Sequence, residues 1–192
     1  MVSDYPFLIR GAGDTTFLRH VADFIERNED RFTPNKADPT RRKWLRMTAG
    51  DIDPAIATKK LELVDRFGIT NWITDPIFDD LIGWIGEGGF VHAHTDGAQA
   101  GRMHIRMNLL VSRPEGGCVP VLDGIPIDVA LGDAWLCFAS ACRHSTTPVT
   151  GKQRRSIISY GLQVENGASF PLYARYLTWK AAHGEAAASA TA

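Results

Sequence analysis

In the first half of the chain the hydrophobic residues recur mostly at helical spacing. From Thr15 to Glu29 the apolar side chains fall three and four residues apart, with polar residues between them, which predicts an amphipathic helix. A second helix is expected to begin at Asp53-Pro54, because aspartate caps a helix and proline suits its first position. It should end before Gly68.

The second half changes to short runs of strand-forming residues separated by glycine and proline turns. Short strands at this spacing favour a sandwich or a barrel. Helices first and strands afterwards indicate an α+β fold with the helices packed on one outer face. The expected strands are Ile82 to Ile85, Met103 to Val111, Cys118 to Leu122, Ala134 to Phe138 and Ser156 to Val164.

The run from Met103 to Val111 is a clear alternating stretch of apolar and polar positions. Successive side chains of a strand point to opposite faces, so one face is apolar and the other is polar and cationic. Two interpretations of the polar face stay open: a solvated outer surface, or the lining of a polar site inside a barrel. The polar face consists of Arg102, His104, Arg106 and Asn108.

The length of 192 residues and a hydrophobic content of 44% are suited to a single domain. We expect that domain to span residues 1–180, with helical support over about 1–80 and the strand-rich core over about 81–165. Residues 30–50 are rich in charge and proline and predict a surface loop, whose part from Arg31 to Arg46 is a candidate lid. The Ala-rich end, 181–192, is expected to be disordered.

Charge and cysteine usage narrow the class of protein further. A net charge of −1 gives no electrostatic reason to bind nucleic acid or an anionic membrane, so a small-molecule partner is expected. The three cysteines form no CxxC pair, and neither a secretory signal nor a long apolar span is evident. The sequence therefore predicts reduced thiols in a cytoplasmic protein.

The chemistry is concentrated in His94, Asp96 and His144. Two imidazoles and one carboxylate are the donor set of a non-haem Fe(II) centre, which leaves one side of the metal open. His94 and Asp96 are two residues apart, so an extended chain presents both on the same face. His92 and His104 remain alternative ligands.

The residues around this set resemble the Fe(II)/2-oxoglutarate-dependent dioxygenases of the prolyl-4-hydroxylase-like branch. The resemblance covers roughly Leu81 to Gln163 and implies a double-stranded β-helix, or jelly-roll, core. It also implies Fe(II), 2-oxoglutarate and O₂ as cofactors. The motifs that carry it are Gly86-Glu87-Gly88-Gly89-Phe90 leading to His94-Thr95-Asp96, then Glu115-Gly116-Gly117, Gly132-Asp133, the segment from His144 to Gly151, and Arg154-Arg155-Ser156.

By this resemblance Arg154 binds the distal carboxylate of 2-oxoglutarate, assisted by Ser156. A planar guanidinium suits a carboxylate because it donates two parallel hydrogen bonds. Arg155 points to the other face of the strand and is the competing candidate. Where the branch often has a tyrosine, this chain has Trp84-Ile85, and Asn108 or Arg106 could take over the contact with the cosubstrate.

The resemblance implies hydroxylation of an unactivated C–H bond, since Asp96 retains the carboxylate that the halogenating relatives lack. The expected substrate is a small amino-acid-like or carboxylated metabolite. A peptidyl residue is the alternative, and a metal-binding cupin that is not an oxygenase, such as an isomerase or a sensor, is a third possibility. The candidate substrate contacts are Arg102, His104, Arg106 and Trp84.

Overall fold

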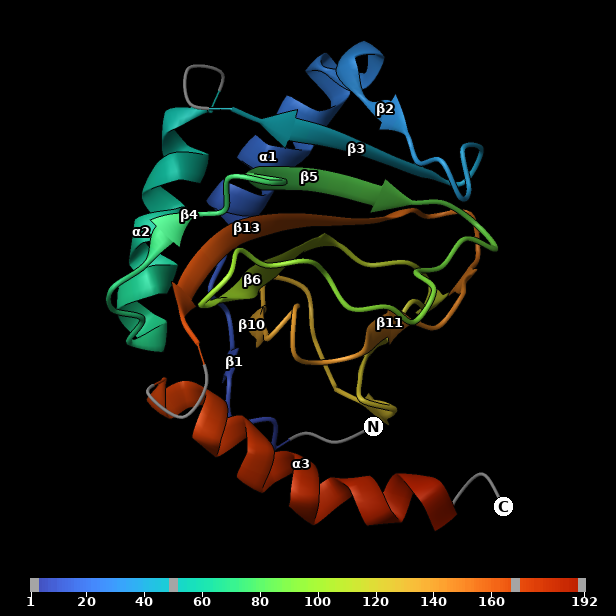
Figure 1. Ribbon diagram of the computed structural model, residues 1–192. Helices are drawn as coiled ribbons and strands as arrows, with labels where there is room; N and C mark the ends of the chain where they lie inside the picture. Colours follow the sequence, from blue (N-terminus) through green and yellow to red (C-terminus); the bar gives the residue numbers. More distant parts are fainter. Residues whose placement is uncertain (1–3, 49–51, 167–169, 190–192) are drawn as a thin grey trace.

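The computed structural model describes residues 4–48, 52–166 and 170–189, and its main element is an eight-stranded antiparallel sheet (Figure 1). The strands follow the order β1-β10-β6-β13-β5-β3-β2, and β4 pairs with β13 beside this path. The strands are β1 (Leu8–Ile9), β2 (Thr33–Pro34), β3 (Arg42–Met47), β4 (Ile73–Thr74), β5 (Asp80–Ile85), β6 (Arg102–Ser112), β10 (Ala134–Cys137) and β13 (Arg155–Glu165).

Two small sheets lie against the inner face of the large one. One has the order β11-β8-β9 and the other pairs β12 with β7. Ile85 of the large sheet packs with Cys118 and Val149, which belong to this smaller side, so the two layers are joined by an apolar contact. Two antiparallel layers closed in this way form the expected jelly roll. The short strands are β7 (Gly116–Gly117), β8 (Pro120–Leu122), β9 (Ile125–Pro126), β11 (His144–Thr146) and β12 (Val149–Thr150).

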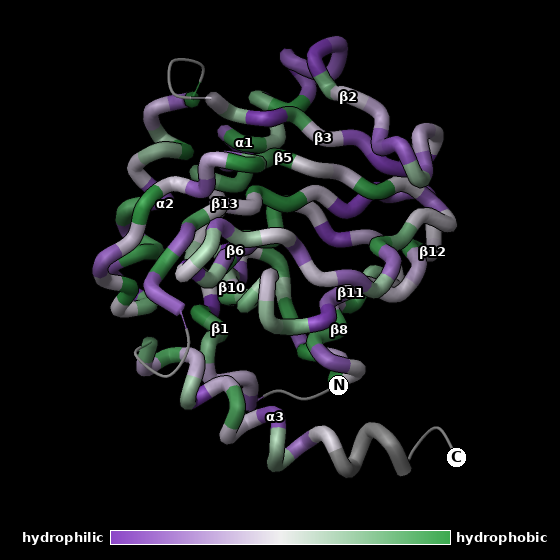
Figure 2. Tube along the Cα trace, in the orientation of Figure 1, coloured by the Kyte–Doolittle hydropathy of each residue, from purple (hydrophilic) through white to green (hydrophobic). Residues whose placement is uncertain are grey.

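Helices α1 (Thr15–Arg27) and α2 (Pro54–Phe67) cover the outer face of the large sheet, with a 3₁₀ turn, η1 (Glu29–Arg31), after α1 (Figure 1). Along both helices hydrophobic and hydrophilic positions alternate, as amphipathic packing requires (Figure 2). The side chain of Asp53 accepts hydrogen bonds from the first turn of α2, and Gly68 ends that helix with φ of 68°. Helix α3 (Pro171–Ser189) lies beside β1. None of the described helices is long and apolar enough to cross a bilayer.

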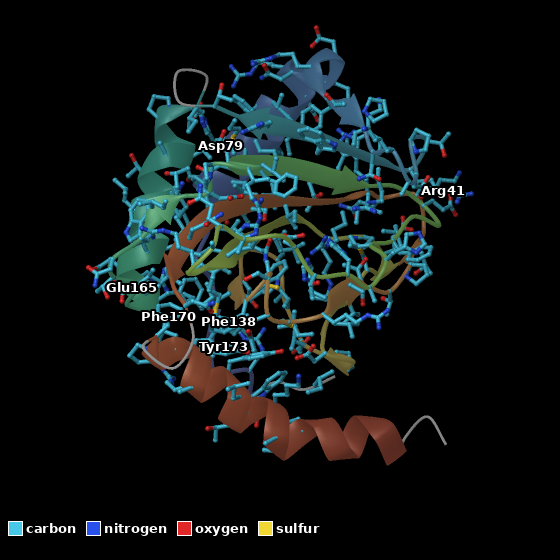
Figure 3. The ribbon with its side chains drawn as sticks, in the orientation of Figure 1. Arg41, Asp79, Phe138, Glu165, Phe170 and Tyr173 are labelled. Carbon is cyan, nitrogen blue, oxygen red and sulfur yellow. The ribbon has the colours of Figure 1, made fainter. Side chains whose placement is uncertain are left out.

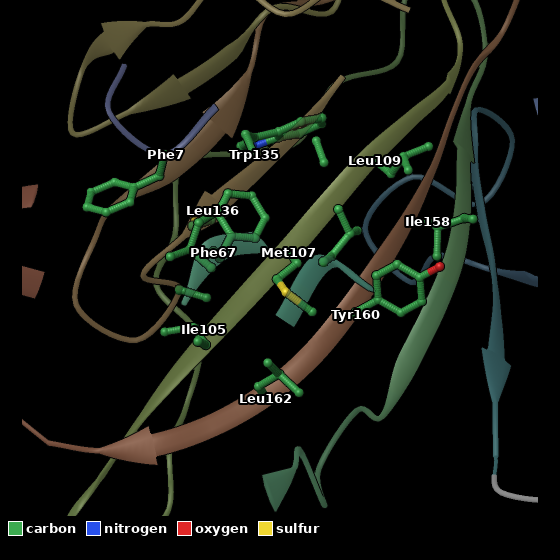
Figure 4. Packing of buried hydrophobic residues seen from close by; sticks show 14 of the residues in the cluster. Phe7, Phe67, Ile105, Met107, Leu109, Trp135, Leu136, Ile158, Tyr160 and Leu162 are labelled. Carbon is green, nitrogen blue, oxygen red and sulfur yellow. The ribbon is translucent and has the colours of Figure 1, made fainter. Parts of the chain in front are cut away.

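The core between the helices and the sheet comes from the apolar side of β6 and β13. Figure 4 shows Ile105, Met107 and Leu109 of β6 beside the apolar residues of β13, and all three are fully buried. The hydroxyl of Tyr160 on β13 donates to the carbonyl oxygen of Ile56 in α2 at 2.9 Å, which fixes the helix to the sheet. Burial of the apolar positions on this side leaves the polar positions of the same strands facing the interior of the jelly roll.

The fold class expected from the sequence is confirmed, together with both helices and four of the five strands; the strand expected from Cys118 begins only at Pro120, because Cys118 has a left-handed backbone with φ of 49°. The surface-loop expectation is wrong for Arg42–Met47, which form β3 and pair with β5, so this part of the candidate lid is a fixed strand. Residues 181–189, expected to be disordered, continue α3, consistent with the high helix propensity of alanine. Residues 190–192 lie outside the described part of the chain.

Candidate metal centre

A backbone bridge brings the two histidines of the candidate centre together from distant parts of the sequence. The amide of His94 donates to the carbonyl oxygen of His144 at 3.1 Å, and the amide of His144 donates back at 2.8 Å. His144 opens β11, and His94 lies in the segment between β5 and β6. The amide of Asp96 donates to the carbonyl oxygen of Ala139 at 2.8 Å, which holds the carboxylate next to both imidazoles.

The ligand atoms of His94, Asp96 and His144 all lie within 4.8 Å of one another, close enough for one metal ion. In each histidine Nδ1 lies within hydrogen-bond distance of a backbone carbonyl oxygen, that of His92 at 2.7 Å and that of Cys142 at 3.1 Å. A carbonyl can only accept, so each Nδ1 carries the proton and each Nε2 keeps its lone pair. This donor set fits a divalent metal, and it consists of the three residues that the sequence predicted as metal ligands. His92 is outside the cluster.

The electrostatics keep the carboxylate ionised. Burial works against the charge of Asp96, but the hydrogen bond that His94 donates when its ring is protonated on both nitrogens, together with the charges of His144, His104 and Arg106, holds its pKa below the usual range. The hydrogen bond to Asp96 raises the pKa of His94, while burial lowers the pKa of His144. The side chain of His94 is 46% exposed and that of His144 only 18%, so solvent reaches the centre from the side of His94.

The two oxygens of Asp96 face different neighbours. Oδ1 lies 3.3 Å from Nε2 of His94 and 4.0 Å from Nε2 of His144, whereas Oδ2 lies 3.6 Å from Nδ1 of His104 and 4.0 Å from Nε of Arg106. His104 is fully buried, and among the described residues neither ring nitrogen has a hydrogen-bond partner, although Nε2 lies 3.4 Å from a carboxylate oxygen of Asp75. Burial and the charge of Arg106 lower the pKa of His104 to about 4, so it is neutral at pH 7. His104 and Arg106 therefore form the wall behind the carboxylate.

Arg106 is held in place by acceptors that the sequence did not single out. Its Nη1 donates to the carbonyl oxygens of Asp79, which Figure 3 labels, and of Ser159, at 2.9 and 3.3 Å. Its Nη2 lies 3.4 Å from the carboxylate of Asp75, which is fully buried and also accepts from the side chain of Gln163 at 2.9 Å. Asp75 and Gln163 gave no signal in the sequence, because the fold alone brings them to this position.

The interior interpretation of the polar face of β6 is confirmed. His104, Arg106 and Asn108 are all buried, and Asn108 lies opposite Trp135 of the neighbouring strand β10. Arg102 is only half-buried and stands at the far end of β6, opposite Glu165. Of the four residues, His104 and Arg106 touch the candidate ligand Asp96, and Asn108 follows on the same face.

The register of β13 separates Arg154 and Ser156 from the metal cluster. Both line a cavity with Ala22 and Glu26 of α1, on the outer side of the sheet. Nη1 of Arg154 donates a hydrogen bond to the carboxylate of Glu29 at 3.0 Å, and the guanidinium carbon lies 5.1 Å from the centre of the Trp84 ring. Strand alternation thus opposes the expected roles of Arg154 and Ser156 towards the cosubstrate, and of Trp84 towards the substrate.

Arg155, the competing candidate, lies on the inner face. It shares that face with Ser159 and Gln163, which pair with Asn108 and His104 of β6. Arg155 is 3% exposed, its guanidinium lies beside the thiol of Cys118, and it is 5.6 Å from the centre of the Trp135 ring. Burial lowers its pKa, the thiol of Cys118 opposes this shift, and among the described residues no carboxylate contributes to it. The interior thus contains a guanidinium available for an anionic ligand.

All three cysteines, Cys118, Cys137 and Cys142, are buried thiols without a disulfide.

Comparison with known proteins identifies the fold. No protein-family profile and no curated protein matches the sequence. Among solved structures, the chain is similar to a viral collagen prolyl hydroxylase from Paramecium bursaria Chlorella virus-1 in complex with 2-oxoglutarate. The TM-score is 0.62 and the identity 14%, over 85% of this chain and 99% of that one.

Two further structures give a similar result. A Pseudomonas putida prolyl-4-hydroxylase aligns with a TM-score of 0.60 and 15% identity, over 83% of this chain and 92% of that one. HygX from Streptomyces hygroscopicus, with nickel and 2-oxoglutarate bound, aligns with a TM-score of 0.60 and 13% identity, over 82% of both chains. At these identities the likeness shows a shared fold, and that fold is the jelly roll implied by the sequence.

Proposed function

We propose that this protein is a non-haem Fe(II)/2-oxoglutarate-dependent oxygenase that hydroxylates an unactivated C–H bond of a small amino-acid-like or carboxylated metabolite. The observation that carries the proposal is the cluster of His94, Asp96 and His144, in which both Nε2 atoms are free to bind a metal. Two histidines and one carboxylate are the ligand set of Fe(II) oxygenases, and they leave positions open for a cosubstrate and O₂.

Each residue has a distinct task in this proposal. His94, Asp96 and His144 hold the iron, and His104 with Arg106 keeps the second oxygen of Asp96 in place. Arg155 replaces Arg154 as the candidate for the distal carboxylate of 2-oxoglutarate, because it lies on the inner face and has no carboxylate partner among the described residues. The metal and cosubstrate supply the oxidising power when bound, while the chain binds, orients and shields the reacting groups from water.

The size of the substrate is the open part of the proposal. Similar folds are found in prolyl hydroxylases and in HygX, one structure of which contains hygromycin B. His104 is neutral and Arg106 is paired with Asp75 and Asp96, so neither is free to bind a large polar ligand, which favours a small substrate over a peptidyl residue.

The test is anaerobic. Metal-free protein receives Fe(II) and then 2-oxoglutarate, and the visible charge-transfer absorption of the chelate is recorded. We expect the absorption in the wild type, none in His94→Ala, and an unchanged signal in His92→Ala, which keeps the backbone carbonyl that orients His94. Tight metal binding without this absorption in the wild type would refute the oxygenase and favour a cupin without 2-oxoglutarate chemistry.

A further inference from the structure

Side chains of the C-terminal helix α3 bind to the segment that precedes the metal ligand His144. Tyr176 of α3 is fully buried, and its hydroxyl oxygen lies 2.8 Å from Oδ2 of Asp123 and 3.0 Å from Sγ of Cys142. Lys180, about one helical turn further on, lies 2.7 Å from the same Oδ2. A hydroxyl has a single proton, which goes to the carboxylate, so the thiol of Cys142 donates to the hydroxyl oxygen.

The carboxylate of Asp123 holds the residue next to His144. Its Oδ1 accepts from the amide of Arg143 at 2.8 Å, and the amide of Asp123 donates to the carbonyl oxygen of Arg143 at 2.7 Å. Burial works against the charge of Asp123, but the hydrogen bonds from Lys180 and Tyr176 hold its pKa below the usual range. Hydrogen bonds to an ionised carboxylate are the stronger kind, so Arg143 is firmly attached.

Cys142 makes the second connection to the metal ligand. It is fully buried, and its carbonyl oxygen lies 3.1 Å from Nδ1 of His144, the contact that leaves Nε2 of His144 free for a metal. A group that hydrogen-bonds to a metal-bound imidazole fixes the orientation of the ring. The thiol of the same residue bonds to Tyr176, so the position of this carbonyl depends on α3.

Apolar contacts alone would attach α3 to the rest of the protein. The ring of Phe138 lies 5.5 Å from that of Tyr173 and 5.0 Å from that of Tyr176, between centroids, and Figure 3 labels Phe138 and Tyr173. The ring of Tyr5 lies 4.8 Å from that of Trp179. Burial of a hydroxyl, a carboxylate and an ammonium under the same helix carries a desolvation cost that attachment does not require.

We propose that Tyr176, acting with Asp123, is a positioning residue of the metal centre, an inference that rests on metal binding as in the proposed function. Asp123 fixes the peptide groups of Arg143, and Tyr176 fixes Cys142, whose carbonyl orients the imidazole of His144. Tyr176 is not itself one of the three ligands. A change at its hydroxyl should nevertheless alter the way in which the protein holds a metal.

The experiment measures the metal site and the stability of the fold separately. Calorimetry gives the Kd of Ni(II), the visible absorption of the Co(II)-loaded protein reports the arrangement of the ligands, and urea unfolding gives the stability. Tyr176→Phe removes only the hydroxyl, and Asp123→Asn removes the charge but keeps an acceptor for Arg143. Tyr173→Phe is the control on the same helix. Tyr5→Phe is the control for stability, because it removes a buried hydroxyl that donates to a different segment, at the carbonyl oxygen of Leu136.

We expect Tyr176→Phe and Asp123→Asn to weaken Ni(II) binding about tenfold and to change the Co(II) absorption, as the loss of a group that supports a metal ligand does. Tyr173→Phe and Tyr5→Phe should keep both properties of the wild type, even though Tyr5→Phe is less stable. A folded Tyr176→Phe or Asp123→Asn with wild-type affinity and absorption would overturn the positioning role and leave the oxygenase proposal intact. Equal weakening in Tyr5→Phe would also overturn it. A wild type that binds no metal would overturn both proposals.

Discussion

The buried carboxylate of Asp75 offers the sharpest test of how the wall behind the metal centre is built. Asp75 is fully buried and accepts from the amide of Phe78 at 3.0 Å and from Gln163 at 2.9 Å. It also faces Arg106, whose guanidinium is almost wholly buried. In Asp75→Asn the amide nitrogen of the new side chain would meet donors where an acceptor stood, and Arg106 would lose the nearer of its two counter-charges, keeping only Asp96 at 4.0 Å.

Removing one partner of a buried ion pair costs about 3 to 5 kcal/mol, because the other charge stays buried without compensation. For a chain of this length that corresponds to a fall of roughly 10 °C in Tm. Urea unfolding at pH 7 measures the loss of stability. The control is Asp128→Asn, since Asp128 is 40% exposed and lies 3.5 Å from Arg10, a pair expected to contribute less than about 1 kcal/mol.

A double variant separates the charge effect from the packing effect. Because Arg106→Met removes the buried charge, Asp75→Asn should cost at least about 1 kcal/mol less in that background than in the wild type. An Asp75→Asn protein as stable as the wild type, or a cost that is the same in both backgrounds, would refute the reasoning that Asp75 neutralises Arg106.

Three further predictions concern stability and metal binding. Lys60→Met leaves Asp80 buried without its partner at 2.9 Å. Burial already raises the pKa of Asp80, and removal of the Lys60 charge would raise it further. The variant should therefore lose about 3 to 5 kcal/mol of unfolding free energy at pH 7, and this deficit should shrink as the pH falls and Asp80 is protonated. Urea unfolding at pH 7 and 4.5 checks this, and an equal deficit at both would contradict it. Gly161→Ala would put a Cβ 2.5 Å from a backbone oxygen and should cost about 1 to 3 kcal/mol in urea unfolding, whereas Gly184→Ala, with nothing within 4 Å, should cost nothing. Ni(II) at a hundred times its Kd should stabilise the wild type by about 2.7 kcal/mol, measured by thermal unfolding, and should not stabilise His144→Ala.

Much of the local structure was determined by the sequence alone. Asp53 with Pro54 and Gly68 set the ends of α2, because caps and left-handed glycines act on a few neighbouring residues. The alternation from Arg102 to Asn108 predicted both a strand and a polar face. The spacing of His94 and Asp96 placed two candidate ligands on the same side of the chain, since side chains two apart in an extended segment share a face.

The tertiary structure decided which face became the interior. Arg154 and Arg155 differ by a single position, and only the register of β13 against β5 and β6 turns Arg155 inward and Arg154 towards α1. The pairing of β3 with β5 likewise brings Arg42, in a segment that resembled a loop, into line with Arg155. Asp75 became part of the site for the same reason. Pairing between distant strands is settled by packing of the whole sheet, so no local pattern in the sequence could reveal these neighbours.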